Sequence, residues 1–102
     1  MVVNLKANEV VLKAGDTNHC LEDNRIPGKL IVTNQRIYFL TKNPDSTRFN
    51  LEITPEQIKE VIFYNTNKIF PNGLNLILKA GQQLRFILKK RNAFGELINK
   101  MY

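Results

Sequence analysis

Apolar and polar residues alternate along most of this chain, and turn-forming residues separate the alternating segments. In residues 48–53, Phe49, Leu51 and Ile53 fall on one side of an extended chain, with polar or charged residues on the other. Alternation of this kind is typical of a half-buried antiparallel strand. Together with runs of β-branched and aromatic residues, it predicts seven strands, over residues 9–14, 29–33, 36–40, 48–53, 58–65, 74–78 and 84–88.

The segments between these strands favour turns. Asn72-Gly73 is a strong hairpin signal, because both residues tolerate positive φ. Pro55 interrupts the pattern, since proline cannot donate a hydrogen bond to a sheet. Residues 15–28 are polar and rich in turn formers, so we expect a loop there, although residues 19–21 also fit an extension of the strand pairing.

The last part of the chain changes its period. Apolar residues recur there with the spacing of one helical stripe, after Asn92, which is a favourable N-cap residue. Gly95 within this stretch costs up to about 1 kcal/mol relative to alanine. The stripe consists of Phe94, Leu97, Ile98 and Met101. The pattern therefore predicts a mainly β domain closed by one C-terminal α-helix.

Length and composition indicate one domain. The chain has 102 residues, 43% of them hydrophobic, which is enough for one core without metals or disulfides. No apolar run approaches the roughly 18 residues of a membrane-spanning helix, and residues 1–6 lack the features of a signal peptide. Cys20 is the single cysteine, so no intrachain disulfide is possible. These features favour a reducing, cytoplasmic compartment, with peripheral contact to a membrane as an option.

The positive charge is concentrated in one part of the chain. The net charge is +6, and residues 61–102 carry seven basic side chains against Glu96 alone, while residues 1–60 are balanced. Such asymmetry is an argument about partners, which we expect to be anionic.

The residue types argue against catalysis. His19 is the single histidine, and its neighbour Cys20 points to the opposite side of an extended chain, so the two do not form a nucleophile–base pair. One histidine and one cysteine do not complete a structural zinc site, and the five glycines are scattered rather than grouped in a phosphate-binding loop. We therefore expect no enzyme, no catalytic or metal site and no cofactor.

Two groups of residues are candidate contacts. The first is a basic group that predicts an anion or membrane contact; its alternative is a solvated face that discourages aggregation at a sheet edge. The second is a pair of outward-facing isoleucines that predicts an apolar contact with a partner or in a dimer. Isolated outward tyrosines do not favour nucleic acid. The basic group is Lys79, Arg85, Lys89, Lys90 and Arg91, and the apolar pair is Ile77 and Ile87.

Several stretches resemble the GRAM domain. Residues 28–39 (GKLIVTNQRIYF) are similar to its G-x-L-x-x-T-N-x-R-h-x-F core, in which h is apolar. Residues 51–61, 70–74 and 93–98 resemble its next strand and turn, its hairpin and its terminal helix. The resemblance covers residues 9–102 and implies one domain over residues 1–102. The implied fold is a pleckstrin-homology-like, seven-stranded barrel of two nearly orthogonal antiparallel sheets, capped by the helix.

The resemblance also implies where a phosphoinositide headgroup would bind, namely at a mouth formed by residues 15–28, 41–48 and 79–82. Four basic and four acidic residues balance each other there, whereas a bisphosphate headgroup requires converging cations. We therefore expect the anion contact at the opposite, helix-capped end. The residues of the mouth are Arg25, Lys42, Arg48 and Lys79 against Asp16, Glu22, Asp23 and Asp45.

These observations predict a stand-alone, non-catalytic, GRAM-like binding module. Its basic C-terminal surface docks to an anionic membrane surface or lipid, or to a protein partner. The alternative is a module for protein interaction or self-assembly without lipid binding.

Overall fold

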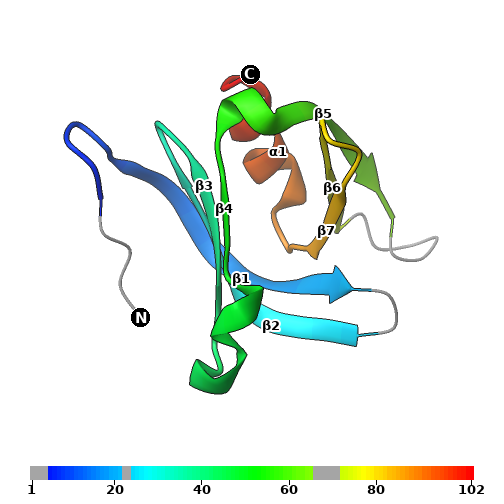
Figure 1. Cartoon of the computed structure of the whole chain (residues 1–102). Helices are drawn as coiled ribbons and strands as arrows, with labels where there is room; N and C mark the ends of the chain where they lie inside the picture. The colour runs from blue at the N-terminus through cyan, green and yellow to red at the C-terminus, as the bar shows by residue number, and fades with distance from the viewer. Residues whose placement is uncertain (1–4, 22–23, 66–71) are drawn as a thin grey trace.

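The computed structural model describes residues 5–21, 24–65 and 72–102. These residues form a seven-stranded antiparallel sheet and one C-terminal helix, as predicted (Figure 1). The strand order is β4-β3-β2-β1-β7-β6-β5. The elements are β1 (Val11–Leu21), β2 (Asn24–Thr33), β3 (Ile37–Thr41), the 3-10 turn η1 (Pro44–Phe49), β4 (Leu51–Ile53), the 3-10 turn η2 (Pro55–Gln57), β5 (Ile58–Tyr64), β6 (Gly73–Leu78), β7 (Gln83–Ile87) and the helix α1 (Arg91–Asn99).

The sheet bends so that β2–β4 lie opposite β5–β7, with α1 at one end between them (Figure 1). Strands β4 and β5 end the strand order without pairing with each other, so the sheet is open. The mainly β class with one C-terminal helix is confirmed, although the seven strands form one open, bent sheet where we expected a barrel of two sheets. The core lies between the two halves, because each strand turns its apolar residues inward. It includes Leu30, Val32, Ile37, Phe39, Ile53, Ile58, Leu74, Leu76, Phe86, Leu88, Phe94 and Ile98.

Residues 15–28, which we expected to form a loop, belong largely to the long hairpin of β1 and β2. Their polar composition concealed the strands, because two inward positions of β1 are polar. The Thr17 hydroxyl donates to the carbonyl oxygen of Ile87 at 2.8 Å. The ring of His19 stacks on the ring of Phe86. A buried polar group with a partner is tolerated in a core, so hydrophobicity alone does not reveal these strands.

Two other boundaries differ from the prediction. The strand expected over residues 48–53 is confined to β4, because Arg48 and Phe49 belong to η1. There the Arg48 guanidinium lies 4.6 Å from the centre of the Phe49 ring. The helix begins one residue earlier than its predicted cap, with Lys90 as N-cap, and Asn92 instead accepts a hydrogen bond from Arg91 Nε.

Gly95 has a reason to lie inside the helix. A Cβ atom at this position would overlap the ring of Phe63, which reaches α1 from β5. The close approach of helix and strand therefore offsets the low helix propensity of glycine. No helix of the described residues is long and apolar enough to cross a membrane.

Candidate binding cleft

The TNQR sequence, residues 33–36, is part of the GRAM-like motif and ties the segment before β1 to the sheet. The Asn34 side chain accepts a hydrogen bond from the Val10 N–H at 2.8 Å and donates to the Asn8 carbonyl at 2.9 Å. Gln35 Nε2 donates to the carbonyl of Ala7 at 3.0 Å. These bonds hold the segment along the β2–β3 turn, so this part of the motif has a structural role in this chain.

A buried ionic group completes this attachment. Arg36 donates to both carboxylate oxygens of Glu9, at 2.8 Å each, and to Glu52 Oε1 at 2.8 Å. The Thr33 hydroxyl lies 2.6 Å from Glu9 Oε2. Burial by itself raises the pKa of Glu9, but the Thr33 hydroxyl, the Lys6 N–H and the Arg36 charge outweigh it. The pKa of Glu9 is therefore held below its usual value, and the carboxylate stays ionised.

The attachment leaves three successive apolar side chains exposed at the start of β1. Val10, Val11 and Leu12 have 57%, 43% and 49% of their surfaces exposed. Three such residues in a row are unusual for a protein surface without a binding role. They lead directly into Lys13, which begins the cleft described next.

A cleft of about 360 Å³ opens where β1 and β7 diverge. Strand β1 pairs with β7 over Asn18–Cys20 alone, so its earlier residues separate from the chain that follows β7. One wall is four successive residues of β1, and the other is the junction between β7 and α1. The lining residues are Lys13, Ala14, Gly15 and Asp16 on β1, and Leu88, Lys89, Lys90 and Phe94 on the other side.

The cleft has an apolar base and a positive rim. Phe94 is buried and lies close to β1 because Gly15 has no side chain; a Cβ there would be 3.2 Å from Phe94 Cζ. Lys13 Nζ lies 5.4 Å from the centre of the Phe94 ring, a distance at which a cation is attracted to an aromatic face. Lys89 and Lys90 are exposed on the opposite wall. Three lysines and an aromatic side chain therefore line the same cleft.

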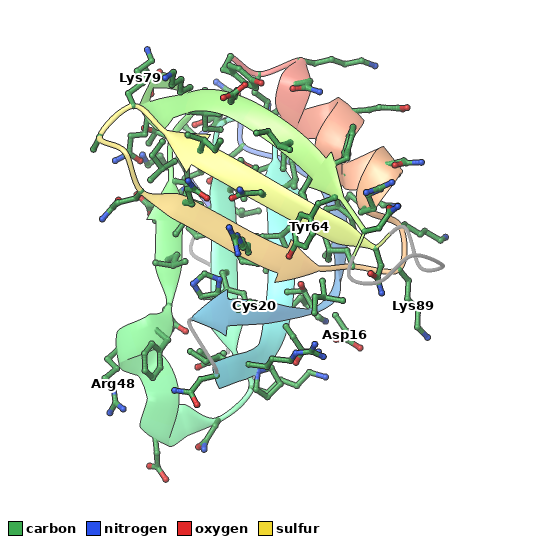
Figure 2. The ribbon with its side chains drawn as sticks, turned by 90° about the vertical axis from the view of Figure 1, so that its right-hand side faces the viewer. Asp16, Cys20, Arg48, Tyr64, Lys79 and Lys89 are labelled. Atoms are coloured by element: carbon green, nitrogen blue, oxygen red, sulfur yellow. The ribbon has the colours of Figure 1, made fainter. Side chains whose placement is uncertain are left out.

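Asp16 is the one carboxylate among the lining residues, and it already has a partner. Its Oδ1 lies 3.5 Å from Lys42 Nζ, with both side chains largely exposed. Lys89 and Asp16 lie at the same end of the molecule in Figure 2 and also line a smaller hollow of about 300 Å³ next to the cleft. Three lysines against one aspartate leave the lining of the cleft with a positive charge.

The structure separates the five basic residues that we proposed as one contact. Lys89 and Lys90 line the cleft, whereas Lys79 lies at the far end of the β6–β7 hairpin, as Figure 2 shows. Arg85 lies on the outer face of β7, where it pairs with Asn75 of β6. A single surface formed by all five residues is therefore absent.

Arg91 has a structural position. Its Nη1 donates to the carbonyl of Tyr64 at 2.7 Å and to that of Gly73 at 3.2 Å, and its guanidinium lies 5.1 Å from the Phe63 ring. These contacts join the first turn of α1 to the end of β5 and the start of β6. Its charge is therefore directed at backbone carbonyls of the chain itself.

The two isoleucines share the outer face without being neighbours. Ile77 pairs with Gln83 and Ile87 pairs with Gly73, so the Asn75–Arg85 pair lies between them. Both side chains are half-buried. The polar Asn75–Arg85 pair therefore separates the two isoleucines, and their contact with a partner stays a prediction.

His19 lies in the core, not in a polar loop. Only 2% of its surface is exposed, its ring centre is 4.9 Å from that of Phe86, and Nδ1 donates to the Arg85 carbonyl at 3.0 Å. Burial lowers the pKa of His19, and the hydrogen bond to the carbonyl opposes this effect only in part. His19 is therefore a neutral core residue, while Cys20 is half-buried on the other face of β1.

The residues that we assigned to a lipid-binding mouth also lie elsewhere than expected. Asp16 and Arg25 lie within β1 and β2 rather than in a loop, and Glu22 and Asp23 lie outside the described residues. Arg25 is on the outer face near the Tyr64 hydroxyl, whose pKa is raised mainly by burial. Lys79 and Arg48, two of the six described residues that we assigned to the mouth, lie far apart in Figure 2, so these six residues do not form one mouth.

Lys13 is the cleft residue that the sequence did not single out. It lies at an irregularity in the pairing of β1 with β2, between Val11 and Lys13. The opposite wall of the cleft, which begins at Leu88, is more than seventy residues later in the chain. A polar residue in a predicted strand carries no local signal of such a neighbour.

Solved structures place this arrangement in a known fold. The C-terminal domain of an unknown protein from Leishmania infantum superposes with a TM-score of 0.77 and 18% identity, over 93% of this chain and 86% of that one. The Vps36 N-terminal PH domain superposes with a TM-score of 0.69 and 14% identity, over 95% and 84% of the two chains. This chain has a PH-like fold.

A third PH structure, the Slm1 PH domain in complex with inositol-4-phosphate, has a TM-score of 0.63 and 10% identity to this PH-like chain, over 89% and 92% of the two chains. No protein-family model matches the sequence, and no curated protein matches it. Identities this low show the fold alone. The narrower GRAM assignment therefore stays a prediction.

Proposed function

We propose that this PH-like domain is a non-catalytic binding module that holds an acidic group of its ligand in the cleft between β1 and the β7–α1 junction. The observation that carries the proposal is the convergence of Lys13, Lys89 and Lys90 on one cleft, with its one lining carboxylate, Asp16, already paired to Lys42. Charge-assisted hydrogen bonds from ammonium groups to carboxylate or phosphate are stronger than neutral ones. The chemistry of the cleft is therefore that of an anion receptor.

The proposal keeps the expected anionic partner but moves the contact. It retains Lys89 and Lys90, adds Lys13, and leaves out Lys79, Arg85 and Arg91, which point elsewhere. The Slm1 PH domain, whose structure contains inositol-4-phosphate, is a structural neighbour that supports an acidic ligand. The exposed apolar residues Val10 to Leu12 beside the cleft suit a peripheral contact with a membrane.

Cosedimentation with vesicles tests the membrane form of this function. Vesicles of phosphatidylcholine with phosphatidylserine are compared for the wild type and for a variant carrying Lys13→Glu, Lys89→Glu and Lys90→Glu. Each lysine near an anionic surface contributes about 1 kcal/mol, so removing three weakens binding by on the order of 100-fold. Addition of salt also weakens it, because exposed charges are screened.

The matched control carries Lys59→Glu, Lys79→Glu and Lys100→Glu. It changes the net charge by the same amount, and all three lysines are exposed outside the cleft. We expect it to retain most of the binding. Equal loss in both variants would mean that net charge alone attracts the ligand, and would contradict a specific role for the cleft.

A further inference from the structure

Part of β1 presents an edge without a strand partner. Strand β2 pairs along one side of β1, but on the other side β7 pairs only with Asn18–Cys20. Among the described residues, no backbone group pairs with this second side between Val11 and Asp16. Unpaired N–H and C=O groups at a strand edge are a template for another extended chain.

The cleft runs along this edge. Successive side chains of a strand point to opposite faces of the sheet, so a cleft on one face is lined by alternate residues. Here four successive residues, Lys13 to Asp16, line the same cleft, which requires that the cleft follow the edge of the strand. The wall opposite contains Leu88, Lys89 and Lys90, the extension of β7 after it leaves the sheet.

We propose that an extended peptide segment of a partner protein, in which acidic and apolar residues alternate, adds to the free edge of β1 in this cleft. The inference rests on the proposed function and names the class of its ligand. The backbone of the peptide pairs with residues 11–16, its carboxylates bind Lys13, Lys89 and Lys90, and its apolar side chains contact Phe94. Backbone hydrogen bonds supply affinity in this mode of recognition, and side chains supply specificity.

The charge of the cleft selects this occupant over a second copy of the chain. Pairing two β1 edges would bring the lysine-rich walls of two clefts together, and like charges on opposed strands are destabilising. An acidic strand instead neutralises the lysines. The exposed side chains of Val10 to Leu12 extend the apolar contact beyond the end of the cleft.

The probe is a synthetic octapeptide of alternating glutamate and valine, titrated into the whole chain and followed by NMR. We expect saturable shifts of the backbone amides of residues 11–16 and slower hydrogen exchange for alternate ones among them. A lysine–valine octapeptide is the charge control, and Lys89→Glu with Lys90→Glu weakens binding of the acidic peptide by at least ten-fold. Thermal melting checks that this variant, which changes exposed residues alone, remains folded.

N-methylation of the peptide tests backbone pairing directly. A strand added to one edge uses the N–H groups of every second residue, so methylation of one alternate set abolishes binding, while methylation of the other set leaves it within a few-fold. Equal binding of the two methylated peptides and the unmodified one would overturn strand addition.

The outcomes separate this inference from the proposed function. Anionic vesicles that bind through Lys13, Lys89 and Lys90, with no binding of the acidic octapeptide, overturn the peptide proposal and leave the acidic-ligand cleft standing. Failure of both vesicles and peptide to bind removes the proposed function as well. Binding of the octapeptide that is insensitive to the lysine substitutions overturns the assignment of the cleft.

Discussion

Arg36 holds Glu9 through both of its carboxylate oxygens, at 2.8 Å from Nε and 2.8 Å from Nη2. This contact joins the β2–β3 turn to a residue twenty-seven positions earlier in the chain. It fixes the segment that leads into β1, and so it sets where the exposed apolar residues and Lys13 begin. The ion pair is thus a structural support of the cleft that lies outside the cleft itself.

We expect the Thr33 hydroxyl to contribute more to the free energy of unfolding than a hydroxyl with a single hydrogen bond. It contacts Glu9 Oε2 and accepts from the N–H groups of Gln35 and Arg36. Thr33→Val keeps the shape of the side chain and leaves these buried groups without their partner, at a cost of about 2 kcal/mol in the free energy of unfolding. Urea denaturation measures it, with Thr41→Val, which loses one bond to the Asn43 carbonyl, as the control. Equal costs would contradict the network.

Glu9 makes stability depend on acidic pH. Its pKa in the folded chain lies below the usual value of 4.5, so the unfolded chain takes up the proton first as the pH falls. The stabilisation is complete above 4.5 and is lost as the pH falls through the lower, folded pKa. Compared with the wild type, Glu9→Gln is less stable at neutral pH, and this difference shrinks in acid. Denaturation curves at a series of pH values measure both, and a constant difference would disprove the role of the carboxylate.

His19 adds a second dependence at higher pH. Burial lowers its pKa in the folded chain below the usual value of 6.5, so the stabilisation is complete above 6.5 and declines below it, toward the folded pKa. We expect the free energy of unfolding of the wild type to fall from about pH 7 to about pH 5 more steeply than that of His19→Gln. Parallel profiles for the two proteins would show that His19 titrates alike in the folded and unfolded chains.

Gly28, the first residue of the GRAM-like motif, is expected to be intolerant of any side chain. A Cβ atom there would overlap the Leu40 carbonyl oxygen on β3 and lie 2.7 Å from Phe39 Cε1. Backbone cannot yield as a side chain does, so Gly28→Ala costs about 3 kcal/mol. Gly15→Ala is the comparison, since its Cβ would meet only Phe94, at 3.2 Å. Thermal denaturation that ranks Gly15→Ala as the more damaging change would refute this explanation.

Arg91 and Lys90 are adjacent in sequence but differ in their surroundings. Arg91→Gln removes bonds to the Tyr64 and Gly73 carbonyls and is expected to cost about 1–3 kcal/mol of stability. Lys90→Gln changes an exposed side chain and stays within about 0.5 kcal/mol of the wild type. Chemical denaturation distinguishes the two, and a large effect of Lys90 on stability would contradict its assignment to ligand binding.

The apolar periodicity of the sequence was sufficient for the strands and the helix whose inward residues are themselves apolar. β6 shows this, because Leu74, Leu76 and Leu78 all face the core, and so does α1, with Phe94 and Ile98 buried. Local pattern is informative there, since the same residues that favour the element also drive its burial. The concentration of positive charge near the C-terminus was equally readable.

The tertiary structure decided what depends on neighbours distant in the chain. Thr17 and His19 are core residues because Ile87 and Arg85 supply their hydrogen-bond partners, and a sequence pattern does not show such compensation. Lys13 belongs to the cleft because β1 pairs with β7 only over Asn18–Cys20. The residues of β1 before this pairing, Lys13 among them, lie opposite the β7–α1 junction. The composition of the sequence therefore led us to expect an acidic partner. The divergence of β1 and β7 determined which lysines share one cleft, because residues distant in the sequence come together only in the folded chain.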